Sequence, residues 1–154
     1  MEGLSLLRSG STACRATGSE ALMPHLISLT AEPSETAGQK DEALDLLKDA
    51  FHIVERTGER WFAAELNRHK GQLLLRQGHA AAAEELYRKA LGIAEEQEAM
   101  LWELRAAMSL AQLWRDQGRP AEARDLLASI YGWFTEGFDT PDLREAKALL
   151  DELA

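Results

Sequence analysis

The chain has 154 residues and a net charge of -9, and 45% of its residues are hydrophobic while 28% are charged. These values are typical of one soluble globular domain. Nucleic acid is an improbable partner, because phosphate backbones are bound through clusters of lysine and arginine, and here 26 acidic residues outnumber 17 basic ones. No apolar run approaches the ~20 residues that cross a bilayer, so we expect no membrane partner.

Cysteine and histidine patterns argue against a disulfide or a metal site. Cys14 is the single cysteine, so no internal disulfide can form, and a reducing, cytoplasmic setting is expected. Glu2 precedes the first apolar patch and Arg8 interrupts it, which is unlike a secretory signal. The four histidines lack zinc-ligand spacing. The sequence therefore predicts no metal, no cofactor and no catalytic residues.

A repeat organises the chain. Gly38, Gly78 and Gly118 follow one another at intervals of 40 residues. The same interval relates other equivalent positions, among them Ala43, Ala83 and Ala123, and also Leu6, Leu46, Leu86 and Leu126. Apolar residues recur at spacings of three and four, with no alternating pattern, so each repeat is predicted to form two helices.

The repeat divides the chain into units in sequence order. We predict a half-unit at 2–16, unit one at 20–57, unit two at 60–97, unit three at 98–137 and a closing helix at 141–154. Poor helix formers at 9–12 predict that residues 1–16 are frayed or displaced. Pro33 predicts that the first helix of unit one ends near Glu32 or kinks there, with a loop at 33–41.

Turn residues mark the later helices. Gly78-His79 and Gly118-Arg119 are predicted turns within units two and three. Pro120 and Pro141 suit the first helical position, where a missing N–H costs nothing, and Thr140 is a plausible N-cap.

The spacing of small and large residues identifies the kind of repeat. In the central unit it is Gly71, Gly78, Ala83, Tyr87 and Ala90. Small residues let helices cross closely while large ones fill the resulting holes, and this order is typical of tetratricopeptide repeats. The predicted fold is all-α, a tetratricopeptide-like α-solenoid of antiparallel helix pairs with a period of 40 residues.

Four segments extend the comparison to a particular family. They are ERTGERW at 55–61, KGQLLL at 70–75, WELRAA at 102–107 and YGWFTEGFDTPDL at 131–143. Residues 15–154 resemble the C-terminal tetratricopeptide arrays of bacterial signalling proteins that also carry an adenylate or guanylate cyclase domain and a STAND ATPase domain. The resemblance implies a regulatory or sensory arm. No phosphate-binding loop is present, so catalytic residues do not carry over.

A candidate binding surface follows from the fold, because the first helices of tetratricopeptide units line a concave face. The predicted partner-binding residues are Arg68, Gln72, Arg76, Arg105, Met108, Gln112 and Arg115. Their positive charge favours an acidic partner or a C-terminal carboxylate. The alternative, slightly favoured, is that these arginines form only exposed ion pairs of small energetic value.

Two further surfaces leave alternatives open. The aromatic residues could form a ligand cage or pack in the core, and packing is favoured, since Trp133 matches Ile53 and Ile93 in the repeat. If residues 1–16 do not cover unit one, an apolar face around Leu22, Leu26 and Leu29 stays exposed, which predicts self-association through the N-terminal end.

The expected function is a non-catalytic scaffold for a protein or peptide partner, in a bacterial signalling system. The alternative is a regulatory segment that acts on a cyclase or STAND ATPase domain outside this chain.

Overall fold

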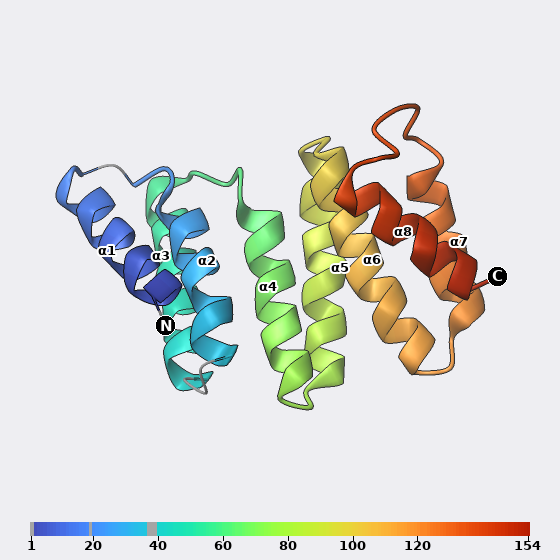
Figure 1. Ribbon diagram of the computed structural model, residues 1–154, viewed down its shortest axis with the longest axis horizontal. Helices are drawn as coiled ribbons and strands as arrows, with labels where there is room; N and C mark the ends of the chain where they lie inside the picture. Colours follow the sequence, from blue (N-terminus) through green and yellow to red (C-terminus); the bar gives the residue numbers. More distant parts are fainter. Residues whose placement is uncertain (1, 19, 37–39) are drawn as a thin grey trace.

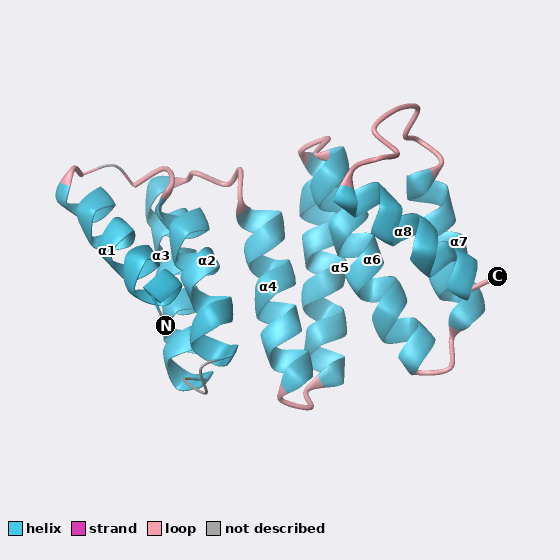
Figure 2. Cartoon of the chain, in the orientation of Figure 1, coloured by secondary structure: helices cyan, strands magenta, loops and turns pink. Residues whose placement is uncertain are grey.

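A computed structural model describes residues 2–18, 20–36 and 40–154, without the side chains of residues 2, 4, 32–36 and 40. These residues form eight α-helices and no strand (Figure 2). The helices are α1 (Glu2–Ala16), α2 (Met23–Thr36), α3 (Lys40–Thr57), α4 (Ala63–Arg76), α5 (Ala80–Glu96), α6 (Met100–Asp116), α7 (Pro120–Tyr131) and α8 (Pro141–Glu152). No helix of the described residues is long and apolar enough to cross a membrane.

The helices stack as antiparallel pairs along one axis, which makes the fold an α-solenoid (Figure 1). Helix α2 pairs with α3, α4 with α5 and α6 with α7. In addition α2 contacts α4, α4 contacts α6, and α6 contacts α8, whereas no comparable contact joins α3 to α5 or α5 to α7 among the described residues. The even-numbered helices therefore form the inner, more closely spaced layer of the curved array.

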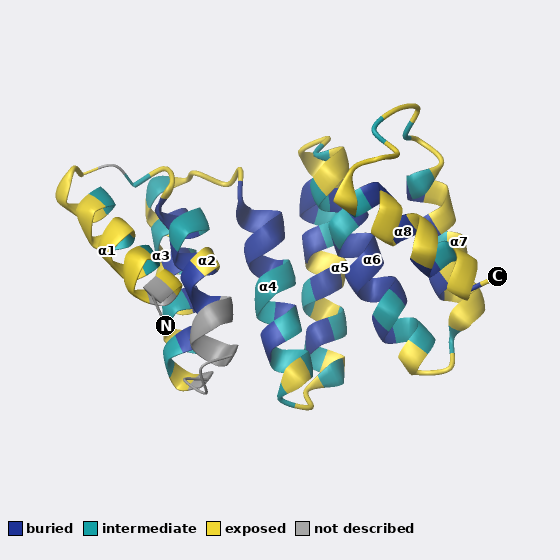
Figure 3. Cartoon of the chain, in the orientation of Figure 1, coloured by how far each residue is buried: buried dark blue, intermediate teal, exposed yellow. Residues whose placement is uncertain are grey.

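The core lies between the two layers and depends on small residues at the helix crossings (Figure 3). Ala43, Ala83 and Ala123 occupy equivalent positions in α3, α5 and α7, and all three are fully buried. Tyr87 fills the space beside Gly71, where α4 crosses α5. The predicted alternation of small and large residues is thus present in the packing.

The turns within units two and three lie where the sequence places them. Gly78 and Gly118 have φ angles of 88° and 78°, which glycine adopts without strain. Helix α5 then begins at Ala80 and α7 begins at Pro120. Helix α8 begins at Pro141, but the hydroxyl of Thr140 donates to the Gly137 carbonyl at 2.6 Å and does not cap the helix. Gly38 lies outside the described residues.

Helix α2 corrects one prediction. Of the two outcomes expected at Pro33, the end near Glu32 with a loop at 33–41 is wrong, because α2 continues through Pro33 to Thr36 and α3 begins at Lys40. A proline inside a helix removes one backbone hydrogen bond and strains the preceding turn. Helix α2 packs against α1, α3 and α4, and such tertiary packing supplies most of a helix's stability in proteins.

Helix α1 is in place against α2 and is not displaced. Arg8 pairs with Glu42 of α3 at 2.6 Å, and Arg15 lies 3.8 Å from Asp49 of the same helix. Cys14 packs against the N-terminal part of the core. These contacts offset the weak helix propensity of residues 9–12, which is the reason that the predicted displacement is wrong.

Candidate partner-binding groove

Five of the seven predicted partner-binding residues line one hollow of about 290 Å³ on the inner layer. Arg68 and Gln72 come from α4, and Arg105, Met108 and Gln112 come from α6. Ser109, Asp142 and Glu145 complete the lining, so α8 forms part of the wall. We call this hollow the groove.

The other two predicted residues lie outside the groove. Arg76 lines a smaller cavity between α2, α3 and α4. Arg115 turns to the end of α8, where its Nη1 atom donates to Glu152 at 2.6 Å, while its Nε atom donates to the neighbouring Asp116 at 3.0 Å.

Arg105 is fixed by two helices at once. Its Nε and Nη2 atoms donate to the two carboxylate oxygens of Asp142 in α8, at 2.8 and 2.9 Å, and its Nη1 atom lies 3.5 Å from Glu65 in α4. The guanidinium carbon also lies 5.2 Å from the ring centroid of Trp102. Paired donation of this kind restricts both the position and the plane of the guanidinium.

Glu65 is a buried carboxylate at the centre of this wall. Its side chain is 3% exposed and accepts hydrogen bonds from Arg68 at 2.7 and 3.0 Å, and His69 Nε2 lies 3.5 Å from it. Burial alone would raise the pKa of Glu65, but the hydrogen bonds and charges of His69 and Arg68 outweigh burial and lower the pKa to about 2. Glu65 therefore remains ionised and holds the arginines in place.

The predicted excess of positive charge is largely neutralised. Arg68 pairs with Glu65, Arg105 with Asp142, and Arg115 with Glu152. Two of these acids, Asp142 and Glu152, belong to α8, which packs against α6. The arginines are therefore held in ion pairs, and those of Arg68 and Arg105 are partly buried, unlike the exposed pairs considered from the sequence.

Two carboxamides and one carboxylate, that of the exposed Glu145, are groove groups without a hydrogen bond or ion pair in the described part of the chain. Gln72 and Gln112 occupy the same repeat position on adjacent inner helices, and both are half-buried. Within the described part of the chain neither side chain makes a hydrogen bond, although each can donate two and accept two. Met108 is buried and serves packing, so it offers little surface to a ligand.

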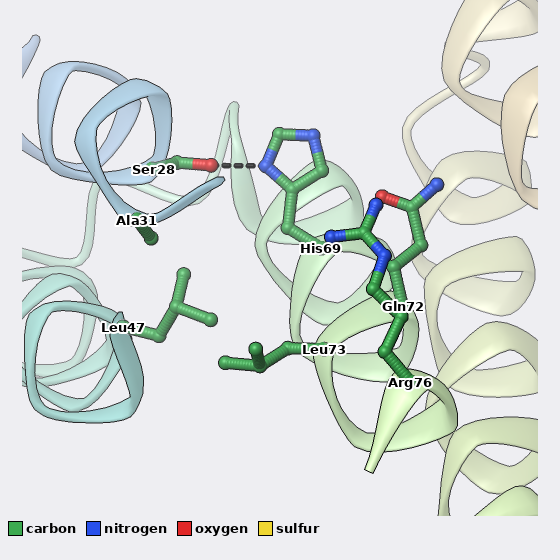
Figure 4. A pocket seen from close by; sticks show the side chains of 7 residues that line it. All are labelled: Ser28, Ala31, Leu47, His69, Gln72, Leu73 and Arg76. Carbon is green, nitrogen blue, oxygen red and sulfur yellow. Dashed lines mark hydrogen bonds between the residues drawn. The ribbon is translucent and has the colours of Figure 1, made fainter. Parts of the chain in front are cut away.

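Ser28 and His69 line the small cavity between α2, α3 and α4 (Figure 4). His69 Nε2 also lies 3.5 Å from Glu65, so the three residues follow the order of a hydrolase triad. Ser28 Oγ is hydrogen-bonded to His69 Nδ1 across the space between α2 and α4. However, Ser28 is 1% exposed, and the cavity beside it measures about 20 Å³, the room for about one water molecule. No substrate can reach this serine, so we assign the three residues a structural role.

The aromatic side chains do not form one cage. Phe62 contacts His25, Trp61 and Trp102, whereas Tyr131 and Phe138 form a separate pair, with ring centroids 5.8 Å apart. Trp133, predicted in the core, is 53% exposed. The reason is that α7 ends at Tyr131, so the helical register that buries Ile93 in α5 does not extend to residue 133.

Comparisons with known proteins agree with this fold. The model of the tetratricopeptide repeat family matches residues 104–129, which cover most of α6 and α7. Among curated proteins, none matches the chain in sequence. The chain is an all-α, tetratricopeptide-like solenoid.

Two solved structures are similar along nearly the whole chain. One contains the nearly identical tetratricopeptide-like repeats of a Podosopora anserina protein described as a kinesin light chain, with a TM-score of 0.67. The other is a single-substitution variant of the same repeats, with a TM-score of 0.68. Each is 18% identical to this chain, and each alignment covers 99% of this chain and 76% of the other. At this identity the likeness concerns the fold alone.

Proposed function

We propose that this protein is a non-catalytic interaction scaffold that holds an extended segment of a protein partner in the groove. The observation that carries the proposal is the pair of unbonded carboxamides, Gln72 and Gln112, on adjacent inner helices of a groove with fixed walls. Both carboxamides are partly exposed, so water can bond them in the free protein, and a ligand that replaces this water gains a net of about 0.5–1.5 kcal/mol for each hydrogen bond.

The chemistry of these groups favours a peptide backbone. Each carboxamide presents a donor and an acceptor, as a backbone amide unit does. Packed helices lie about 8–10 Å apart, which is about three residues of extended chain at ~3.3 Å each. Successive contacts would therefore fall on every third residue of the bound segment.

The groove does not favour an acidic partner, because its two arginines are paired and the exposed Glu145 carboxylate is not. An acidic segment would have to displace Asp142 from Arg105 or Glu65 from Arg68, and both pairs are well formed. We therefore keep the proposal that the partner is a protein or peptide, and we do not propose that it is acidic. Self-association through the N-terminal end remains a prediction: α1 packs on α2 and partly covers this face, but Leu22 and Leu29 are still exposed.

The cellular role is proposed from the resemblance alone. The segments at 102–107 and 131–143 support a cytoplasmic regulatory or sensory arm of a bacterial signalling system. A regulatory segment of a cyclase or STAND ATPase assembly is the alternative. Addition of the purified chain to such a catalytic domain separates the two, because only the alternative predicts a change in its rate.

The groove is tested with Gln72→Ala combined with Gln112→Ala. Peptides selected from a random library on the natural chain would be titrated against both proteins by fluorescence anisotropy. Loss of two hydrogen bonds costs about 1–3 kcal/mol, so we expect binding to weaken about tenfold to a hundredfold.

The matched control is Gln77→Ala combined with Gln117→Ala, at equivalent positions outside the groove. Equal weakening by both pairs, or no effect of either, would exclude the groove as the binding site. Arg68→Glu is a poorer probe, because it would place a second carboxylate against buried Glu65 and disturb the fold.

A further inference from the structure

A different surface lies where the chain passes from one helix pair to the next. The four connections that precede α2, α4, α6 and α8 all lie along one long edge of the solenoid, at the top of Figure 1. We name the part formed by residues 20–22, 58–62 and 95–101 the connection edge. We propose that the connection edge binds a basic, amphipathic segment of a protein partner.

Large apolar side chains are exposed along this edge at each connection. Their exposed fractions are 53% for Leu22, 39% for Trp61, 41% for Met100 and 43% for Leu101. The opposite edge, at the turns 77–79 and 117–119, has no large exposed apolar side chain. Exposed apolar side chains that gather on one surface mark protein interaction sites, whereas scattered ones need no explanation.

Hydrogen bonds join the three connections into one surface. Trp61 Nε1 donates to the Ala21 carbonyl at 3.0 Å, which ties the connection before α4 to the one before α2. Gln97 Nε2 donates to the Arg60 carbonyl at 2.8 Å, which ties the connection before α6 to the connection before α4. The exposed apolar residues therefore lie on a single, fixed edge.

The charges beside these apolar residues are mainly negative. Four acidic residues of the edge are exposed and make no ion pair with any described residue: Glu59, Glu95, Glu96 and Glu98. Glu20 is already satisfied by Arg56, at 2.6 and 2.9 Å, and Arg60 is the one basic residue within the edge. A partner with lysines or arginines around apolar side chains is complementary to this arrangement.

Glu98 is held in a backbone conformation that disfavours it. Its φ angle is 53°, whereas Gly18 and Gly58 occupy the equivalent position of the other connections, with φ angles of 73°. Left-handed backbone is unfavourable for a residue with a side chain, and such strain is concentrated at functional positions. Here the strained residue carries one of the unpaired charges in the middle of the edge.

The test uses a fluorescein-labelled peptide of two Leu-Lys-Lys-Leu-Leu-Lys-Lys heptads, titrated by anisotropy at physiological salt. We expect the natural chain to bind it and to bind the corresponding Leu-Glu peptide at least about tenfold more weakly. Glu96→Lys with Glu98→Lys, and separately Met100→Ser with Leu101→Ser, should each weaken binding of the lysine peptide about tenfold or more.

Matched controls change the same residue types elsewhere. Glu85→Lys with Asp125→Lys reverses two exposed, unpaired charges on α5 and α7, and Leu29→Ser removes an exposed leucine from α2. Both controls should bind within about twofold of the natural chain, with circular dichroism showing intact helices. Equal weakening by Glu85→Lys with Asp125→Lys would show general charge attraction and overturn the proposal.

Two further outcomes have a defined meaning. If the chain sediments as a dimer that Met100→Ser with Leu101→Ser dissociates, the edge joins two copies of this protein and the proposed partner is wrong. The Gln72→Ala and Gln112→Ala variant should bind the lysine peptide normally, because those residues lie in the groove. Failure at one surface therefore leaves the other proposal standing.

Discussion

Gly71 in α4 lies against the ring of Tyr87 in α5 so closely that a side chain cannot be added without movement. A Cβ atom on Gly71 would lie 2.6 Å from Tyr87 Cε1, 2.9 Å from Cδ1 and 3.3 Å from the Ala83 carbonyl oxygen. Tyr87 is 1% exposed and belongs to a core cluster with Ala83, Leu110 and Leu113, and side chains in such cores are closely packed. Helices α4 and α5 can therefore lie this close together only because residue 71 has no side chain.

Gly71→Ala should destabilise the protein. Overpacking costs about 1–3 kcal/mol, which exceeds the ~1 kcal/mol that alanine gains over glycine inside a helix. Gly92→Ala in α5 is the control, because no atom lies within 4 Å of its added Cβ, and it should raise the free energy of unfolding by about 1 kcal/mol. Urea unfolding measures both; an equal gain for the two variants would contradict the close crossing.

Glu98→Gly should stabilise the chain, although it removes a side chain. Relief of the left-handed strain is worth about 1–2 kcal/mol, and the greater freedom of glycine in the unfolded chain offsets less than ~1 kcal/mol of it. The reciprocal change, Gly58→Ala, places a side chain at a φ of 73° and should lower stability. Thermal unfolding of the two variants should therefore shift in opposite directions.

Titration of Glu65 makes the folded chain less stable as the pH falls below 4.5. Its pKa is about 2 in the folded chain, against an ordinary value of 4.5, so its contribution is fully present above pH 4.5 and is lost as pH falls toward 2. This difference between the two pKa values corresponds to about 3 kcal/mol of folding stability. Glu65→Gln should be less stable at pH 7 and should lose less stability between pH 5 and about 2; a curve parallel to that of the natural chain would refute this role.

Glu103, unlike Glu65, has a raised pKa, so its charge lowers the stability of the folded chain. It is buried, its Oε1 atom lacks a hydrogen bond, and other units place Met23, Ala63 and Leu143 at the same repeat position. Burial and the charge of Glu95 raise the pKa of Glu103, so its ionised form destabilises the fold at neutral pH. This destabilisation decreases as pH falls through the raised pKa toward 4.5.

Replacement of Glu103 by an apolar residue of similar size should therefore raise the free energy of unfolding. Glu103→Leu should raise the free energy of unfolding at pH 7 by about 1–3 kcal/mol, with a smaller gain near pH 5. Glu95→Gln is the companion variant, and it should give a smaller gain because it removes only the repulsion. Denaturant titrations at the two pH values measure this difference, and a gain that does not depend on pH would point to packing alone.

Local patterns in the sequence were enough to predict the helix pairs, the glycine turns and the starts of α7 and α8, because spacing and backbone preference determine them. Tertiary packing determined what was missed. Helix α2 passes through Pro33 because its neighbours stabilise it, and Trp133 is exposed because α7 is short. The charge of the groove depends on Arg105 meeting Asp142, 37 residues away on α8. The repeat predicts this closing helix, but not which of its side chains pairs with α6.

The line of polar contacts across the inner helices has a mechanical consequence. Ser28 of α2 meets His69 of α4, and Glu65 of α4 and Asp142 of α8 both meet Arg105 of α6. Straightening the solenoid would stretch these links in series, so they act as a tether that limits how far the concave side can spread. A groove whose width is set in advance loses little conformational entropy when an occupant enters.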